Sequence, residues 1–432
     1  MIVFLCGLLL TTGGCATLGW YGQAARGQME LLLKRKDIEK LIASPDTPED
    51  RRRKLELVLA VREFAGDELG LPDNGSYSGF VKLERDAVVY NVIAAPEFSV
   101  AAKTWCYPLV GCLAYRGYFD RSDAERRAEK LAEQGYDVMV SPVAAYSTLG
   151  RFKDPVTSPM LKYGEVRLAG LLFHELAHQR VFVKGETDFN EAYATTVERE
   201  GVRRWLRHLD RQAAIEAWEE SRRIESAFTS LLLRARADLE ALYSRDIPPE
   251  RMRREKQAVF QALQRRHAEF VRKSGDDRFD AWMQQELNNA HLALLATYEA
   301  GTDAFGHLLA EYDGDFERFH QAVERLAAAG RETRADFLNQ CRTSTVTHRF
   351  RNNQSPPDVP GQGTARRQWP IPWQALQRRP GASGGLPSGE PLSGHLRRCA
   401  GLKWGLPFRR QRVLHLTAQR LAGCFEIYGS RY

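Results

Sequence analysis

The 432-residue sequence predicts an α+β fold that is mostly helical, with a small sheet in the first half and a helical second half. From Gly164 onward, hydrophobic residues recur at helical spacing almost without interruption. Residues 75–150 instead hold short runs of β-branched and aromatic residues, which are typical of strands. Hydrophobic residues make up 43% of the chain, enough for a sizeable buried core.

Each predicted element follows from local spacing and from the residues that break it. Hydrophobic spacing over residues 28–69 predicts two helices, interrupted at Ser44-Pro45 and Pro48. Short strands are expected near residues 80–81, 87–92, 105 and 137–140, with a helix over 123–134 between the later ones. Further helices are expected over 165–183, 189–209, 211–243, 250–273, 279–298 and 316–328. Ile247-Pro248-Pro249 marks the turn of a helical hairpin.

The first fifteen residues have the composition of an export signal. An apolar run over residues 2–10 is too short to span a bilayer and is followed by small residues. Thr12-Gly13-Gly14-Cys15 is similar to a lipobox, in which Cys15 would be acylated and anchor the chain to a membrane. A buried apolar helix with an ordinary thiol at Cys15 is the alternative. We divide the chain into residues 1–15 (signal), 16–163 (helices and small sheet), 164–341 (helical region) and 342–432 (tail).

The net charge of +7 comes from the C-terminal end. Residues 342–432 carry 15 Lys and Arg against three acidic residues, a net of +12, so residues 1–341 carry a net of −5. No nucleic-acid partner is therefore expected for the main body. The tail is also rich in Pro and Gly, which predicts disorder or a non-native extension. A basic binding arm is the alternative.

Two cysteines, Cys106 and Cys112, lie away from both the signal and the tail, since the others belong to the signal or lie in or at the edge of the tail. They are six positions apart, with Pro108 and Gly111 between them to bend the chain. In an oxidising compartment they are expected to form a disulfide. A zinc-binding pair and two free buried thiols are the alternatives.

The strongest motif is His-Glu-x-x-His at residues 174–178. On a helix, His174 and His178 share one face and can bind one Zn²⁺, while Glu175, one position along, can act on a water molecule. The flanking residues, such as Leu172 and Phe173, are apolar, which favours a buried site over a solvated surface helix.

A third protein ligand is expected from the next helix, because catalytic zinc sites use three. Glu191 lies 13 positions after His178, enough chain to turn back antiparallel. The alternative for Glu191 is a capping box with Asp188 as the N-cap, after a helix end at Gly185. Glu198, two turns later on the same face, is the competing ligand. Otherwise Glu198 supports a ligand or binds the substrate's amine.

This pattern resembles the gluzincin metallopeptidases, in which a downstream Asn-Glu pair, here Asn190-Glu191, supplies the glutamate ligand. More widely, the chain over residues 15–340 looks like a predicted aminopeptidase family of bacterial envelope lipoproteins. The segments that carry this resemblance are TWCYP at 104–108, GCLAYRGYF at 111–119, AYSTLG at 145–150, NNA at 288–290 and TY at 297–298. The resemblance implies a zincin-like fold and a zinc aminopeptidase that faces the periplasm.

The expected mechanism is hydrolysis of a peptide, with Glu175 as general base. Tyr146, Tyr193 and Tyr298 are candidates to stabilise the oxyanion, although each is an ordinary packed tyrosine in the alternative interpretation. Glu198 or Glu165 could bind the free amine of the substrate. Two other functions stay open: a zinc endopeptidase of envelope proteins, and a non-catalytic binding lipoprotein stabilised by zinc.

Overall fold

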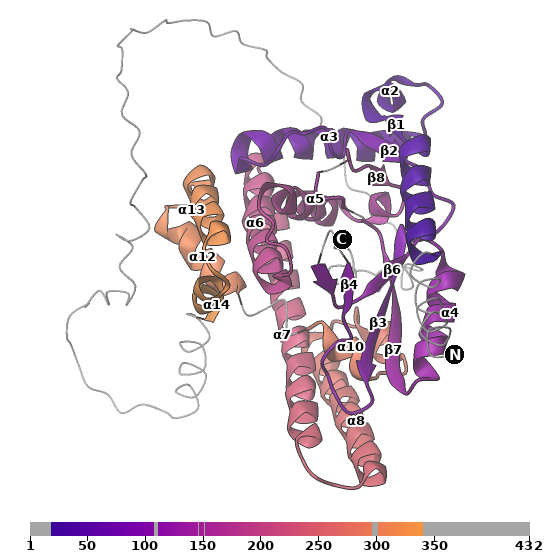
Figure 1. Cartoon of the computed structure of the whole chain (residues 1–432). Helices are drawn as coiled ribbons and strands as arrows, with labels where there is room; N and C mark the ends of the chain where they lie inside the picture. The colour runs from indigo at the N-terminus through magenta and orange to yellow at the C-terminus, as the bar shows by residue number, and fades with distance from the viewer. Residues whose placement is uncertain (1–18, 108–110, 146, 151, 296–300, 340–432) are drawn as a thin grey trace, which may run out of the picture. The chain divides into compact units, whose positions relative to one another are not determined.

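Helices make up most of the described structure, and every described strand lies in the first half of the chain (Figure 1). The computed structural model describes residues 19–107, 111–145, 147–150, 152–295 and 301–339, which all belong to one compact unit. This arrangement confirms the predicted α+β class. The predicted signal at 1–15 and the predicted tail at 342–432 lie outside the described residues.

Three helices precede the first long strand. Residues 19–34 are helical, followed by α2 (Ile38–Ala43) and α3 (Glu49–Leu69). The predicted break at Ser44-Pro45 is confirmed, since Ser44 caps α2 with extended backbone. Two helices were expected and three are present, because a further break falls between residues 34 and 38, where a short strand begins.

The strands form three small sheets rather than the single one expected. The first joins β1 (Lys36–Asp37), β2 (Gly79–Val81) and β8 (Val156–Thr157) in that order. The second, antiparallel throughout, has the order β6 (Arg116–Tyr118), β3 (Val89–Pro96) and β7 (Tyr136–Val143). The third pairs β4 (Trp105–Tyr107) with β5 (Gly111–Leu113).

The central strand β3 is covered on both faces. Successive side chains of a strand point to opposite faces, and α4 (Arg121–Ala132) packs on the face that carries Tyr90 and Val92. On the other face, α10 (Asn289–Ala293) packs against Ile93. A helix from the second half of the chain therefore completes the core of the first half.

The hairpin β4–β5 carries the predicted disulfide. Cys106 and Cys112 face each other across the two strands and are bonded. The expected disulfide is confirmed in this structure, since the antiparallel register of β4 and β5 places the two cysteines opposite each other. The zinc-pair alternative is thereby excluded.

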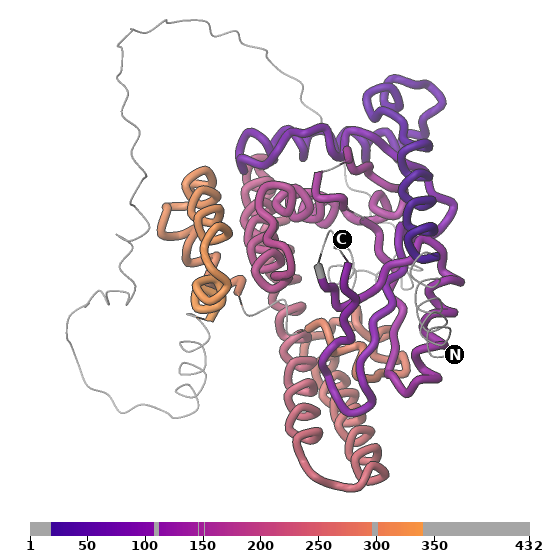
Figure 2. The backbone as a smooth tube through the Cα atoms, viewed as in Figure 1, coloured from indigo at the N-terminus to yellow at the C-terminus, as the bar shows by residue number. Residues whose placement is uncertain are grey.

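Between Met160 and Asn339 all described elements are helices. The elements are η1 (Met160–Lys162), α5 (Glu165–Arg180), α6 (Thr187–His208), α7 (Gln212–Tyr243), α8 (Pro249–Ser274), α9 (Asp280–Met283), α10, α12 (Thr302–Glu311), α13 (Phe316–Ala328) and α14 (Arg331–Asn339). Most predicted helices are confirmed to within a few residues. The long helices α7 and α8 lie side by side as the predicted hairpin (Figure 2).

The predicted helix over residues 279–298 is wrong. The structure has two short helices there, α9 and α10, separated by residues 284–288. Asn288 is the cause, since its backbone is extended and its side chain accepts a hydrogen bond from the backbone N–H of Ala290. His291 completes a capping box, which starts a new helix at this point.

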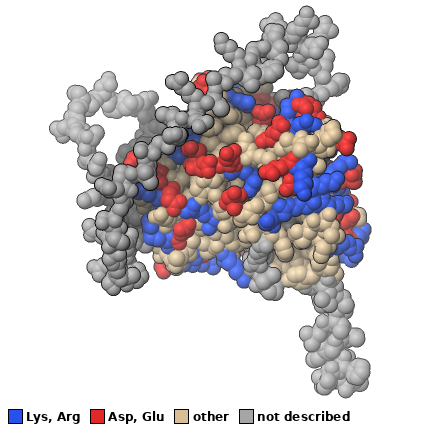
Figure 3. Space-filling view, turned by 90° about the horizontal axis from the view of Figure 1, so that it is seen from above, with Lys and Arg blue, Asp and Glu red and all other residues tan. Residues whose placement is uncertain are grey.

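Acidic and basic side chains are both present, interspersed with other residues, on the face shown in Figure 3. Among the described helices, none has both the length and the hydropathy that a membrane span requires.

Candidate metal centre

Helix α5 carries the His-Glu-x-x-His motif into the interior. The helix starts after Gly164, and residues 172–178 are all buried, including the side chains of His174, Glu175 and His178. Burying three titratable groups on one helix turn costs free energy, and a cation bound among them offsets that cost. The predicted burial of the motif is confirmed.

Helix α6 brings Glu191 back to the motif, because α5 and α6 pack against each other along their lengths. The predicted caps at the turn are wrong. Helix α5 ends at Arg180 with Val181 as its cap, and α6 begins at Thr187 without a side-chain cap from Asp188. The turn is closed instead by Asn190, whose amide accepts from the Val183 backbone N–H at 2.7 Å and donates to the Val183 carbonyl at 2.9 Å.

The ligand atoms converge on one point. The Nε2 atoms of His174 and His178 are 2.9 Å apart, and each lies 3.5 Å from a carboxylate oxygen of Glu191. The three residues are buried, and all three ligand atoms lie within 4.8 Å of one another. Glu191 therefore does not serve in a capping box with Asp188, because its carboxylate points toward the two histidines.

These separations fit a small tetrahedral cation. Ligand atoms at about 2.0–2.1 Å from a tetrahedral zinc ion lie about 3.3 Å from one another, close to the separations of 2.9 and 3.5 Å found here. Two imidazoles and one carboxylate also form a ligand set that zinc prefers and that leaves a fourth position for substrate or water.

Glu198 contacts the opposite side of His174. Its Oε2 lies 3.1 Å from His174 Nδ1, so Glu198 lies behind a ligand and Glu191 among the ligands. Burial raises the pKa of Glu198, but the hydrogen bond from His174 and the nearby charges of Arg222 and Arg199 outweigh it and hold that pKa below 4.5. The carboxylate therefore stays ionised and fixes the Nδ1 hydrogen of His174.

Two glycines let α5 and α6 approach closely. A Cβ atom on Gly201 would lie 2.8 Å from side-chain atoms of both Leu69 and Phe173, the residue before His174. On α5, a Cβ on Gly170 would lie 3.2 Å from Val202 and 3.4 Å from Glu198. The absence of side chains at these two positions thus sets the distance between the helices that carry the ligands.

Tyr77 was missed by the sequence analysis. Its side chain is wholly buried, its φ is 59°, and its backbone N–H donates to the carbonyl of Asp154 at 2.6 Å. Burial, together with the charges of Glu175 and Asp154, raises the pKa of Tyr77 well above its usual range. A protonated hydroxyl therefore lies in the electrostatic surroundings of Glu175. No local pattern distinguishes this residue from a core tyrosine.

Asp154 ties the segment that carries Tyr77 to α5. Its carboxylate accepts hydrogen bonds from Thr148 and Ser147, and from the Gln179 amide at 3.3 Å. Gln179 directly follows His178 and also accepts from Asn74 at 2.7 Å. Burial raises the pKa of Asp154 despite these hydrogen bonds.

The other predicted residues lie elsewhere. The hydroxyl of Tyr193 is 2.9 Å from His320 Nδ1 in a buried aromatic cluster, and Glu165 is exposed and paired with Arg211 at 2.9 Å. Tyr146, Tyr298 and Cys15 lie outside the described residues.

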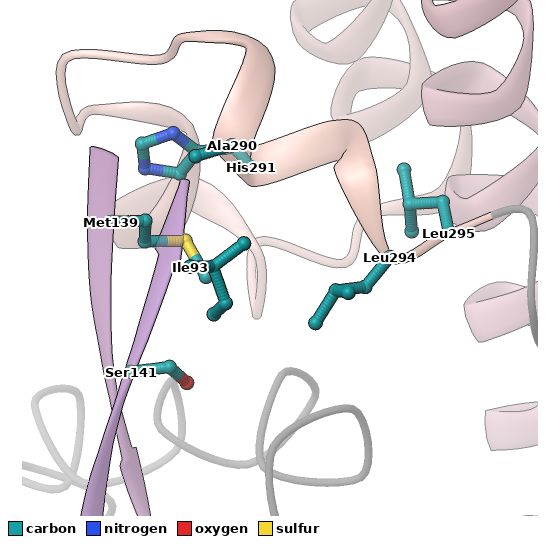
Figure 4. Close-up of a pocket in the computed structure, with 7 residues that line it drawn as sticks. All are labelled: Ile93, Met139, Ser141, Ala290, His291, Leu294 and Leu295. Carbon is teal, nitrogen blue, oxygen red and sulfur yellow. The ribbon is translucent and has the colours of Figure 1, made fainter. Parts of the chain in front are cut away.

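A small cavity is separate from this cluster. It lies between the strands β3 and β7 and helix α10, has a volume of about 10 Å³, and is mainly apolar (Figure 4). Its lining residues are Ile93, Met139, Ser141, Ala290, His291, Leu294 and Leu295. None of them belongs to the metal cluster.

Comparison with known proteins links the chain to a protein family. The searches of curated proteins and of solved structures found no match. Residues 19–338 match the model of a family described as "Putative aminopeptidase". This segment contains both helices of the metal cluster and most of the 432-residue chain. The chain therefore belongs to this aminopeptidase family.

Proposed function

We propose that the protein is a zinc-dependent aminopeptidase of the gluzincin type. One observation carries the proposal: His174, His178 and Glu191 converge in a buried cluster on two helices, with Glu175 next to His174 on the same turn. A site that only stabilised the fold would not require Glu175, which is not a ligand. The family description supports peptides as the substrate class.

A zinc ion bound by the three ligands would lower the pKa of a water molecule and polarise the scissile carbonyl. The protein's own contribution is to place a base beside it. Glu175 accepts the proton of the attacking water and passes it to the departing amine. Because Glu175 is wholly buried, bulk water does not compete for its carboxylate.

Glu198 controls the tautomer of His174. Its carboxylate can only accept a hydrogen bond, so Nδ1 of His174 carries the hydrogen and the lone pair of Nε2 faces Glu191 and His178. The orientation of one ligand is therefore fixed before a metal binds. Because Glu198 is hydrogen-bonded to His174, an amine of the substrate would have to compete with His174 for the Glu198 carboxylate.

We further propose that the protein faces the periplasm and is anchored by a lipid on Cys15. The supporting observations are the apolar segment at residues 2–10, the lipobox-like Thr12-Gly13-Gly14-Cys15, and the bonded Cys106–Cys112 pair. Structural disulfides persist mainly in oxidising compartments, including the periplasm.

The experiment compares zinc-loaded wild type with Glu175→Gln on aminoacyl-arylamides and on N-blocked peptides. Loss of the base should lower the rate by about 10²–10⁴-fold, while the zinc content stays unchanged because Glu175 is not a ligand. The matched control is Glu129→Gln, at an exposed position of α4, which should change neither quantity.

The outcomes separate the alternatives. Cleavage of blocked peptides but not of free aminoacyl substrates would identify an endopeptidase. Two outcomes would favour a non-catalytic binding lipoprotein stabilised by zinc. The first is full zinc occupancy without cleavage of either substrate, and the second is a Glu175→Gln variant that cleaves as fast as wild type.

A further inference from the structure

The first helix exposes an unusual share of the large apolar side chains. Among the described residues, four large hydrophobic side chains are exposed, and three of them lie on the helix at 19–34: Tyr21 at 41%, Met29 at 53% and Leu33 at 78%. Scattered single residues of this kind need no explanation, but their concentration on one helix marks an interaction surface.

Two of these side chains, Met29 and Leu33, lie opposite the face that holds the helix in place. Residues 26, 29 and 33 are spaced by three and four positions, so they share one face. The other face is buried, since Leu31 belongs to the core cluster with Val88, and a Cβ on Gly27 would lie 2.0 Å from the ring of Phe119. The helix is thus docked on the protein and presents the stripe Arg26, Met29 and Leu33 outward.

The charge around this stripe is positive. Residues 19–36 carry four Lys and Arg against Glu30 alone, a net of +3, so residues 37–341 carry a net of −8. Glu30 is paired with Lys34 at 2.9 Å and with Arg85 at 2.8 Å. Arg26 and Lys36 are exposed, and no carboxylate of the described residues pairs with either. An apolar stripe with unpaired cations fits the surface of a membrane with anionic headgroups.

We propose that this face of the first helix is a membrane-docking surface, with Met29 and Leu33 entering the headgroup region of an anionic bilayer. The inference does not depend on catalysis by the metal centre. It adds a second contact to the proposed lipid on Cys15, four residues before the helix, and a single acyl chain gives only marginal, reversible binding. Tyr21, near the start of the helix, suits the interface between headgroups and acyl chains.

The test uses the full chain with Cys15→Ser, which removes the acylation site, and vesicles of phosphatidylglycerol and phosphatidylcholine. Met29→Glu with Leu33→Glu should weaken cosedimentation at least about tenfold, because two apolar contacts are replaced by charges that the anionic surface repels. The matched control is Gln261→Glu with Gln264→Glu, which adds the same charge at exposed positions of α8 and should leave vesicle binding unchanged.

A neutral pair, Met29→Gln with Leu33→Gln, should also weaken binding, and thermal unfolding of every variant should match wild type because the replaced side chains are exposed. Raised salt should weaken the binding of wild type. Equal vesicle binding by wild type and both double variants would overturn the proposal. So would a change in oligomeric state with vesicle binding unchanged, which would assign the stripe to a second copy of the chain. A failure of peptidase activity would not affect any of these readings.

Discussion

His174 lies between two carboxylates, with Glu191 near one ring nitrogen and Glu198 at the other. The two glutamates have different roles. A metal would occupy the space among His174 Nε2, His178 and Glu191, whereas the hydrogen bond between His174 Nδ1 and Glu198 would stay in place. Glu198 therefore affects the metal only through the ring of His174.

Glu198→Gln should lower zinc affinity by about 10–100-fold, the usual effect of losing a carboxylate behind a histidine ligand. Glu191→Gln should lower it further, because an anionic ligand itself is lost. Chelator competition with purified protein measures both affinities. Equal affinities for Glu198→Gln and wild type would contradict the tautomer argument.

The candidate site could be predicted from sequence only where it is local. His174, Glu175 and His178 lie on one helical turn, and Glu191 follows after a single short connection, so spacing was sufficient. Tyr77 reaches the surroundings of Glu175 from about a hundred residues away, and spacing carries no information about such an approach. The cap at Asp188 was wrong because Asn190 closes the turn through the backbone of Val183.

At the scale of elements, the space around two helical glycines predicts opposite effects on stability, since Gly201 lies in the close contact of α6 with α5 and Gly306 faces open space on α12. Gly201→Ala should destabilise the fold by about 1–3 kcal/mol, because its Cβ meets buried side chains of Leu69 and Phe173. Gly306→Ala on α12 should stabilise slightly, because no atom lies within 4 Å of its added Cβ and alanine favours helix. Denaturant unfolding compares the two.

Zinc affinity is a second measurement that distinguishes Gly201→Ala from Gly306→Ala. Gly201→Ala should also weaken zinc binding, since a wider gap between the helices moves Glu191 away from the histidines. Gly306→Ala should leave it unchanged. Unchanged stability and zinc binding in Gly201→Ala would show that the helices adapt without moving the ligands.

Amphipathic helices were the elements easiest to predict. The helix expected over residues 316–328 is α13 with the same bounds, because its apolar positions repeat at helical spacing and Asp315 caps its start. The sheets were harder, since β1 and β8 are two residues long and exist only through pairing with β2. Such pairing depends on residues far apart in the chain, which no local pattern encodes.

For the whole molecule, two buried histidines predict sensitivity to acid. Burial lowers the pKa of His291 and of His320 from 6.5 to about 4 in the folded protein. Between pH 4 and pH 6.5 the unfolded chain binds more protons than the folded chain, which favours unfolding. The contribution of the two neutral histidines to stability is therefore complete above pH 6.5 and is lost as the pH falls toward 4. Each histidine accounts for about 3 kcal/mol over this range.

The free energy of unfolding should therefore fall steeply between pH 7 and pH 4. In His320→Gln this free energy should depend less on pH than in wild type, although it should be lower at pH 7. The matched control is His307→Gln, at an exposed position of α12, which should keep the wild-type slope. Parallel curves for wild type and His320→Gln would refute the assignment.

The side chain of His320 also makes two hydrogen bonds: Nε2 donates to the carbonyl of Leu69 on α3 at 2.8 Å, and Nδ1 lies 2.9 Å from the Tyr193 hydroxyl on α6. The contact with Leu69 joins residues 251 positions apart. During synthesis, the chain through Glu191 contains all three metal ligands, but at about 5–20 residues per second the ribosome needs on the order of ten seconds more to reach His320. The three candidate ligands are thus made well before the residue that ties α3 to α13, so the metal cluster is complete in the sequence while that contact is still missing.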